Sequence, residues 1–317
     1  MLHGVASNRA CLLLGSLPGC VPTVGGLELG LESNMAAFLV AASRAGVRYD
    51  RTITIGRQSV NFGPGSLRSI LTNAGVAVPR EAQAAIFSGD GYAEPFFRAL
   101  GAEHIDSVDN STYENASHVA DLNLPVDAAL KSSYSAVVDS GSTEHVFNYP
   151  QAIKNCMEMV APGGHYLGIV PANNLCGHGF YQFSPEAMYR IFCEENGFIA
   201  ERVYIVEQVP GARWLRAPDP RTVRQRVEYS GTRAAYIYVR AKRVSTVPIF
   251  ATYPQQSDYV EHWSSGEGDD RRRSKPAGRL RNIVGGLPAP VKRAISNLAL
   301  LGRRRNALLA PVDLFTD

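Results

Sequence analysis

The stretch that decides the fold is residues 134–170, YSAVVDSGSTEHVFNYPQAIKNCMEMVAPGGHYLGIV. It begins with a β-branched run that ends at Asp139, continues with a helical pattern over about 149–160, and ends with a second apolar run over 165–170. Pro162-Gly163-Gly164 separates the helix from the second run, as expected of residues that stop a helix. A strand, a helix and a strand in this order predict a βαβ unit and therefore a parallel sheet.

The same alternation extends outward from this unit in both directions. Short apolar or β-branched runs predict further strands at 51–55, 104–109, about 121–123, 199–207 and 234–241. Helical patterns occur at Ser33–Gly46, Ser66–Ala74, Ala93–Leu100 and, with Ser184 as the cap, from Pro185 to Asn196. We therefore predict an α/β, Rossmann-like fold: a seven-stranded, mostly parallel sheet with helices on both faces.

The composition is that of a globular protein with one full-sized core. The chain has 317 residues, 45% of them hydrophobic, and a formal net charge of +3. That charge is too small to indicate a nucleic-acid-binding protein, and no run approaches the ~20 apolar residues of a membrane span. The five cysteines fit neither a paired-CxxC zinc site nor a disulfide framework, so we expect no metal and a reducing, cytoplasmic location.

Basic residues are concentrated near the end of the chain, from Arg271 to Arg305. We predict an N-terminal extension over 1–32, the α/β domain over 33–245, and a linker with a basic, amphipathic C-terminal extension over 246–317. The extension could dock on anionic lipid as a peripheral membrane contact. Packing against the domain, or against a second subunit in a homo-oligomer, is the favoured alternative.

Three of the predicted strands end in an acidic residue: Asp109, Asp121 and Asp139. In parallel α/β sheets, ligands bind in the crevice outside the carboxyl ends of the strands. The three carboxylates are therefore predicted to lie along one edge of the sheet, at a ligand pocket.

These features resemble the class I S-adenosylmethionine-dependent methyltransferases. The resemblance covers about 51–240, and it is carried by the acid-tipped strands, by Glu144-His145-Val146 after the fourth strand and by Ala161-Pro162-Gly163-Gly164 before the fifth. The chain is similar in particular to an uncharacterised bacterial group often encoded among genes for surface-polysaccharide biosynthesis. The tracts shared with that group are Glu144–Asn148 and Asn173–Glu186.

The resemblance implies S-adenosylmethionine as the cofactor and assigns contacts to it. Asp109 would accept hydrogen bonds from the ribose hydroxyls, which suits a carboxylate because it is only an acceptor. Asp121 would receive the adenine amino group, and Leu122 would pack on the ring. The alternative for both acids is an ordinary turn-capping role. The predicted cofactor-binding residues are Gly56, Gly89, Gly91, Asp109, Asp121, Leu122 and Asp139.

The glycine loop departs from the pattern of this family. A methyltransferase of this class has several glycines directly after its first strand, because only bare backbone can approach the cofactor closely. Here the strand is followed by Gly56-Arg57-Gln58, and the next glycine is Gly63. Either an insertion separates the strand from a split loop at Gly89 and Gly91, or the cofactor site has been remodelled or lost.

The candidate catalytic residues follow the fourth and fifth strands. His145 lies where the reactive methyl should point and is suited to accept a hydroxyl proton, with Glu144 orienting it; the alternative is a packing residue beside a helix cap. The tract that begins at Asn173 combines amides, imidazole, phenol and glycines, which suits a sugar. The predicted catalytic residues are His145, Glu144, His178 and Tyr181. The predicted substrate-binding residues are Asn173, Asn174, Tyr181, Gln182 and Arg213.

The function expected from this combination is transfer of a methyl group from S-adenosylmethionine to a polar small molecule or glycan precursor, by O-methylation. One alternative is a non-catalytic scaffold or binding protein with a degenerate cofactor loop. The other is a nicotinamide-dependent sugar-modifying enzyme, which is disfavoured because no GxGxxG follows the first strand.

Overall fold

The computed structural model describes residues 30–209, 211–264 and 306–317. Its helices are α1 (Ser33–Arg44), α2 (Pro64–Ala74), α3 (Arg80–Ser88), α4 (Glu94–Ala99), α5 (Tyr149–Met159), α6 (Pro185–Ile191), α7 (Pro220–Val223) and α8 (Ser257–Ser264). Its strands are β1 (Gly30–Glu32), β2 (Arg51–Ile55), β3 (Ser59–Asn61), β4 (His104–Asp109), β5 (His118–Val119), β6 (Tyr134–Ser140), β7 (Val160–Asn173), β8 (Phe198–Glu207), β9 (Trp214–Arg216), β10 (Ala235–Arg243) and β11 (Ala310–Val312).

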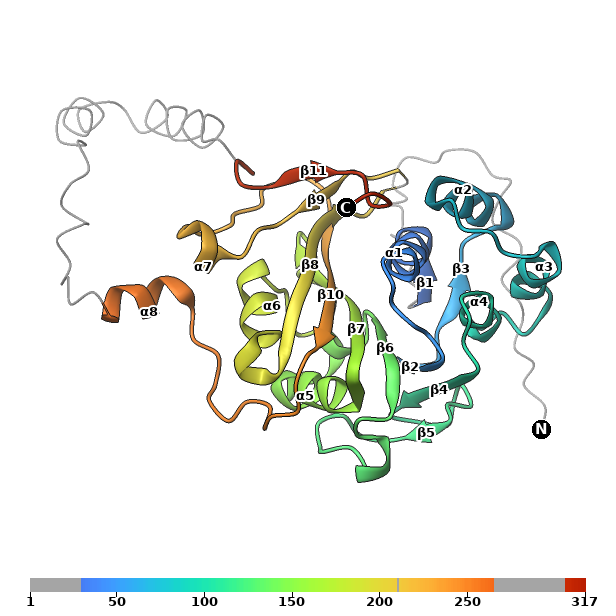
Figure 1. Ribbon diagram of the computed structural model, residues 1–317, viewed down its shortest axis with the longest axis horizontal. Coiled ribbons are helices and arrows are strands. Elements are labelled where there is room, and N and C mark those ends of the chain that lie inside the picture. Colours follow the sequence, from blue (N-terminus) through green and yellow to red (C-terminus); the bar gives the residue numbers. More distant parts are fainter. Residues whose placement is uncertain (1–29, 210, 265–305) are drawn as a thin grey trace, which may run out of the picture.

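One large mixed sheet runs through the molecule (Figure 1), with strand order β11-β9-β8-β10-β7-β6-β2-β4-β5. The five strands from β5 to β7 are parallel to one another, whereas β10 runs antiparallel to both β7 and β8. Strands β9 and β11 add a further antiparallel edge. The predicted α/β, Rossmann-like fold is confirmed, but the sheet has nine strands of mixed orientation and not seven mostly parallel ones.

The parallel half of the sheet contains a topological switch point between β2 and β6. From β2 the chain adds β4 and then β5 on one side, and it returns to place β6 and then β7 on the other. Helices that connect strands on opposite sides of such a point leave a crevice outside the carboxyl ends of the two central strands. The fold therefore places its ligand crevice between the ends of β2 and β6.

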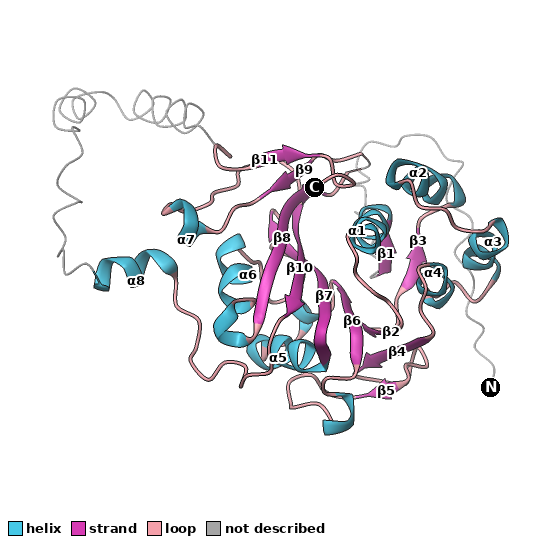
Figure 2. Ribbon diagram, viewed as in Figure 1, coloured by secondary structure: helices cyan, strands magenta, loops and turns pink. Residues whose placement is uncertain are grey.

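Side chains of alternate residues supply two separate cores, one on each face of the sheet. In β6, Ala136 and Val138 belong to the core under α1, α2 and α4, whereas Val137 belongs to the core under α5 and α6. In β10, Tyr238 and Ile237 divide in the same way, as expected for the two-residue period of a strand. Helices α1 to α4 accordingly lie on one side of the sheet and α5 and α6 on the other (Figure 2).

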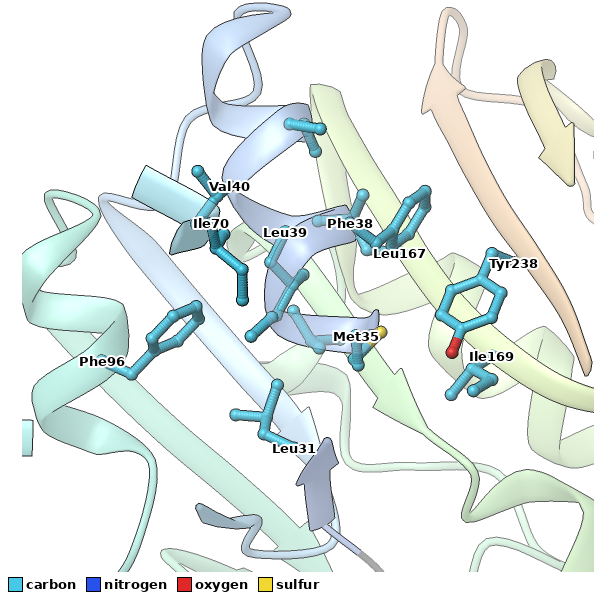
Figure 3. Packing of buried hydrophobic residues seen from close by; sticks show 14 of the residues in the cluster. Leu31, Met35, Phe38, Leu39, Val40, Ile70, Phe96, Leu167, Ile169 and Tyr238 are labelled. Carbon is cyan, nitrogen blue, oxygen red and sulfur yellow. The ribbon is translucent and has the colours of Figure 1, made fainter. Parts of the chain in front are cut away.

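Helix α1 covers the centre of the first face. Met35, Phe38, Leu39 and Ala42 recur at the spacing of one helix face and are at most 1% exposed; burial of each of the larger side chains contributes about 1.5–3 kcal/mol. Figure 3 shows Met35, Phe38 and Leu39 next to side chains that project from the sheet. The N-cap residue of α1 is Glu32, which makes no side-chain capping bond.

The predicted insertion after the first strand is a small helical unit. Helix α2 begins at Pro64, where a proline suits the first helical turn. Helix α3 was not predicted from the sequence, and Ile86 is its one buried residue. The chain then returns to its starting point: the Val60 N–H donates to Gly91 O (2.8 Å) and the Ala93 N–H donates to Gln58 O (2.8 Å). Helix α4 therefore follows β2 in space as though the inserted residues were absent.

The described end of the chain belongs to the sheet edge. Strand β11 pairs with β9, and the Asp317 carboxylate accepts bonds from Arg202 Nε, Arg216 Nη1 and the Tyr204 hydroxyl, each at 2.9 Å. Residues 306–317 of the predicted extension are thus part of the α/β unit, whereas the basic stretch at 271–305 lies outside the described residues. The remaining domain boundaries stay predictions.

Within the described ranges, every helix is too short or too polar to cross a bilayer.

The Asp317 contacts generate a test of this edge. We expect Asp317→Ala to lower the free energy of unfolding by about 1–2 kcal/mol, because Arg216 and the Tyr204 hydroxyl lose their acceptor, whereas Arg202 keeps its bonds to the main-chain oxygen of Asp317 and Arg216 remains partly hydrated. That change corresponds to a decrease in Tm of roughly 2–6 °C. Glu195→Ala, which removes the exposed 3.7 Å pair with Arg221 and a local contact with Cys193, is the control. Equal Tm values for the two variants would contradict the assigned role of Asp317.

Candidate active site

A cavity of about 280 Å³ lies at the carboxyl ends of β2, β4, β5 and β6, where the switch point places it. It brings together predicted residues from four separate segments. The lining residues are Ile55, Gly56, Val108, Asp109, Asn110, Ala120, Asp121, Leu122, Asn123, Ser142, His145 and Val146.

Gly56 forms the floor of this cavity at the end of β2. Its φ is +72°, and a Cβ there would lie 3.2 Å from both Gln58 Nε2 and Ser142 Oγ. Any other residue would therefore be strained and would also crowd its neighbours. The glycine leaves bare backbone facing the cavity, as the cofactor loop of the resembled family requires.

Asp109 presents one free carboxylate oxygen at the end of β4. Its Oδ1 accepts a bond from the Ser111 N–H (3.0 Å), the Asx turn considered as its alternative role. Its Oδ2 has no donor among the described residues and would be 3.8 Å from a Cβ on Gly56. The turn therefore orients the carboxylate, and Oδ2 can still accept hydrogen bonds from a ligand.

Asp121 and Leu122 lie beyond β5, in the turn that follows it and not in the predicted strand at 121–123. The Asn123 N–H and side-chain amide donate to Asp121 Oδ1 at 2.9 and 2.7 Å, and these bonds hold the pKa of Asp121 below its ordinary value. Leu122 is 7% exposed and lines the cavity. The pair offers a carboxylate next to an apolar surface.

Asn155 holds this turn in place, and the sequence analysis missed it. It projects from α5, fully buried, and its amide donates to Leu122 O (3.1 Å) and Leu124 O (2.8 Å). Its Oδ1 accepts from the Val126 N–H (3.2 Å). A polar residue on the buried face of a predicted helix was the signal that could have found it.

Gly89 and Gly91 do not line the cavity. They lie where the insertion returns to Arg57, whose guanidinium pairs with Asp90 (2.9 Å) and Glu94 (2.7 Å). An insertion after β2 is therefore present, as one of the two predictions required. These ion pairs hold the end of the insertion against the residue that follows β2. Of the three predicted glycines, Gly56 alone faces the cavity.

Asp139 is buried behind the cavity and does not line it. It accepts bonds from the Ser142 N–H (2.8 Å), Thr143 Oγ1 (2.5 Å) and the Tyr166 hydroxyl (3.1 Å). Burial nevertheless raises its pKa above the ordinary value. Because these bonds shape the turn after β6, the structure gives Asp139 a positioning role where direct cofactor contact was predicted.

Glu144, His145 and His178 lie close together after β6 and β7, and His145 lines the cavity. His178 Nε2 lies 3.2 Å from Glu144 Oε1, and the His145 and His178 ring centroids are 5.0 Å apart. Glu144 is fully buried, and this burial raises the pKa of its carboxyl. The predicted pairing is wrong in one respect, since the carboxylate is bonded to His178 and not to His145.

The rest of the tract after β7 is mostly bonded within the protein. The Asn174 amide donates to Gly231 O and Arg233 O, both at 3.0 Å, and Tyr181 donates to Phe147 O (2.5 Å). Gln182 Oε1 accepts from the Leu175 N–H (3.0 Å), Asn173 ends β7 opposite Ala235, and Arg213 is exposed beside β9. These contacts shape the tract so that its His178 reaches the cluster.

An exposed aromatic pair, not predicted from the sequence, flanks the two imidazoles. Phe147 follows His145 by two residues, and Phe180 follows His178 by two. Their side chains are 71% and 63% exposed, and their rings meet edge to face with centroids 5.6 Å apart. The mouth of the site therefore combines imidazoles with an accessible apolar surface.

A larger cavity, of about 420 Å³, lies between α6, α7 and the start of α8. Two of its arginines are paired with carboxylates: Arg190 with Asp219 (2.5 Å) and Arg226 with Asp258 (2.6 Å). It is also away from the carboxyl ends of the parallel strands. We therefore do not regard it as the active site.

No protein-family model and no curated protein sequence matches this chain. Among solved structures it is similar to 1,6-didemethyltoxoflavin-N1-methyltransferase of Burkholderia thailandensis, with S-adenosylhomocysteine bound, at 13% identity over 67% of this chain and 78% of that one, with a TM-score of 0.36. It is also similar to the N-methyltransferase NodS of Bradyrhizobium japonicum, at 13% identity over 67% of this chain and 95% of that one, with a TM-score of 0.35. A third similar structure is a mutein of the branched-chain polyamine synthase of Thermus thermophilus, at 12% identity over 72% of this chain and 60% of that one, with a TM-score of 0.34. These TM-scores are low. The fold is therefore assigned from the order of the strands, and the site is assigned from its own geometry.

The contacts of Asn155 predict a large stability loss on its removal. We expect Asn155→Ala to lower the free energy of unfolding by about 2–4 kcal/mol, because three buried backbone groups lose their partner. Gln151→Ala is the matched control, since Gln151 donates to Asn155 (2.8 Å) from the same helix and its loss leaves those backbone bonds intact. Urea unfolding of both variants measures the difference. A loss for Asn155→Ala no larger than that of the control would contradict the role of Asn155.

Proposed function

We propose that this chain is an S-adenosylmethionine-dependent methyltransferase that acts on a polar small molecule. The observation that carries the proposal is the free Asp109 carboxylate oxygen facing Gly56 at the switch point. Vicinal ribose hydroxyls need an acceptor at the end of a strand and bare backbone beside it. The cavity supplies both, and the low likeness to solved methyltransferases plays no part in the inference.

The remaining lining residues fit a nucleoside. Asp109 Oδ2 would accept from the ribose hydroxyls, Leu122 would pack on the adenine, and Asp121 would accept from its amino group. The cavity volume, about 280 Å³, is close to the lower end of the ~300–1,000 Å³ range of ligand sites. The cofactor, when bound, supplies a methyl group on a positively charged sulfur. The protein holds the nucleoside and leaves the end of β6 for the acceptor.

The acceptor would occupy the mouth of the cavity beside His145. Methyl transfer requires mainly that the acceptor atom lies in line with the carbon–sulfur bond of the methyl group. A hydroxyl acceptor must also lose its proton. His145 and His178, the latter held by Glu144, are the groups placed to assist that loss. The exposed ring of Phe180 offers a stacking surface for the apolar face of a sugar. O-methylation of a glycan precursor is therefore our proposal for the acceptor class.

Two alternatives fit the site less well. A nicotinamide-dependent enzyme would be expected to have GxGxxG after β2 and a sixth parallel strand beside β7, whereas this chain has Gly56-Arg57-Gln58 and the antiparallel β10. A scaffold that had lost its cofactor would have no need of the strained Gly56 or of the free oxygen on Asp109.

Isothermal titration with S-adenosylhomocysteine tests the proposal. We expect micromolar binding by the wild-type chain and a loss of roughly 100-fold or more in Asp109→Ala, because two hydrogen bonds to a charged acceptor are removed. Asp106→Ala removes a carboxylate from the same strand whose partner is Tyr134, and it should bind normally. An absence of binding by the wild-type chain, or equal affinity in Asp109→Ala, would refute the proposal, and binding of NAD in its place would favour the nicotinamide enzyme.

A matched pair of glycine variants tests the close approach at Gly56. Gly46 (φ +92°) has no atom within 4 Å of a Cβ position, whereas Gly56 (φ +72°) has several. Both Gly→Ala variants should lose about 1–2 kcal/mol of stability from backbone strain. Only Gly56→Ala should also lose binding of S-adenosylhomocysteine. Unchanged affinity in Gly56→Ala would mean that the ligand does not approach this backbone.

A further inference from the structure

Glu144, His145 and His178 form a three-residue group with the side-chain types of a metal site. One ligand atom from each residue can be chosen so that all three lie within 4.8 Å of one another. Glu144 and His145 belong to the short turn after β6, and His178 belongs to the loop after β7. In the described part of the chain, no other three His, Cys, Asp or Glu residues meet in this way.

Glu144 is one of several described residues with a buried side-chain polar atom that lacks a hydrogen-bond partner, and it is the one that lies next to two imidazoles. Its side chain is 0% exposed, its Oε1 is bonded to His178 (3.2 Å), and its Oε2 is buried without a hydrogen-bond partner among the described residues. A buried carboxylate oxygen without a partner costs free energy. A cation bound by both carboxylate oxygens would remove this cost.

The loop that carries His178 is seated directly on Glu144. Gly179 has a φ of +72°, and a Cβ on it would lie 3.0 Å from both Glu144 Cγ and Glu144 O. The Phe180 N–H donates to Glu144 O (2.9 Å). The ring of Tyr236 meets the His178 ring edge to face at 6.0 Å. The position of His178 against the carboxylate is therefore fixed by the backbone that follows it and by the ring of Tyr236.

We propose that Glu144, His145 and His178 bind one divalent first-row transition cation at the mouth of the cavity. Two imidazoles and one carboxylate are a ligand set that Zn²⁺ and Fe²⁺ accept, and they leave at least one coordination position open. Metal–ligand distances of about 2.1 Å separate tetrahedral ligand atoms by about 3.4 Å. Glu144 and His178 already have this separation, and the exposed His145 reaches it by side-chain rotation.

The open position would face the acceptor, next to the cavity wall formed by His145. There the cation would bind an acceptor oxygen and favour release of its proton to solvent. The oxygen would then form a bond to the methyl carbon as the carbon–sulfur bond breaks, and S-adenosylhomocysteine would leave. This use of the metal rests on the proposed function, with His145 and His178 acting as metal ligands in place of the proton-accepting role given there, whereas metal binding itself does not.

Calorimetric titration of the full, tag-free chain with Zn²⁺, after dialysis against a chelator, measures the binding directly. We expect one ion per chain with micromolar or tighter affinity, and a loss of roughly 100-fold or more in His145→Ala and in His178→Ala. The control is His118→Ala, which removes a partly exposed imidazole that lies 3.9 Å from Asp106. It should bind Zn²⁺ as the wild-type chain does.

His145→Ala keeps the test informative, because the exposed His145 can be removed without disturbing the core. Glu144→Gln is compared only if its circular dichroism and Tm match the wild type. Visible absorption of bound Co²⁺ provides a second readout, and its intensity should fall in the same variants. An absence of stoichiometric binding, or equal affinity in His145→Ala, His178→Ala and wild type, overturns the metal site. S-adenosylhomocysteine titration of the same samples separates the two proposals, since either ligand can bind while the other fails.

Discussion

The buried Asp139 carboxylate is the interaction on which the rest of the site depends. Its three donors come from the turn after β6 and from Tyr166 on β7, and Ser142 in that turn also donates to Ile55 O at the end of β2 (2.8 Å). The ends of β2 and β6 are thereby joined to the middle of β7. Because a buried carboxylate must be hydrogen-bonded, this geometry leaves the turn little freedom, and the turn presents Glu144 and His145.

Two buried carboxylates in the same region give the site its electrostatic character. Asp139 is satisfied by its donors, whereas Glu144 has one oxygen bonded to His178 and the other without a partner in the described ranges. Each negative charge disfavours ionisation of the other, and burial raises both pKa values. The negative charge of Glu144 is therefore not fully compensated by the described residues. Both proposals would add positive charge near it: the cofactor through its sulfur at the cavity, and the metal ion by binding Glu144 itself.

The elements predicted correctly are those whose local pattern is strong. The strands at 51–55 and 104–109 and the helix that begins at Tyr149 were placed within a residue or two, because β-branched runs and a helical period are properties of consecutive residues. Strands β9 and β11 have three residues each, and β11 lies about 100 residues further along the chain than its partner β9. Strands this short give no recognisable pattern in the sequence, so the sheet was predicted with too few strands.

By itself, the sequence determined the class of fold and the edge of the sheet that would carry the site, because both follow from the order of strands and helices and from the acids at the strand ends. Tertiary structure alone decided which of the predicted residues face the cavity. Asp109 and Gly56 do, whereas Asp139 turns inward, and the amides after β7 bond to backbone. The reason is that burial and hydrogen-bond partners are set by segments distant in the chain, such as Asn155 on α5 beneath the turn at Leu122.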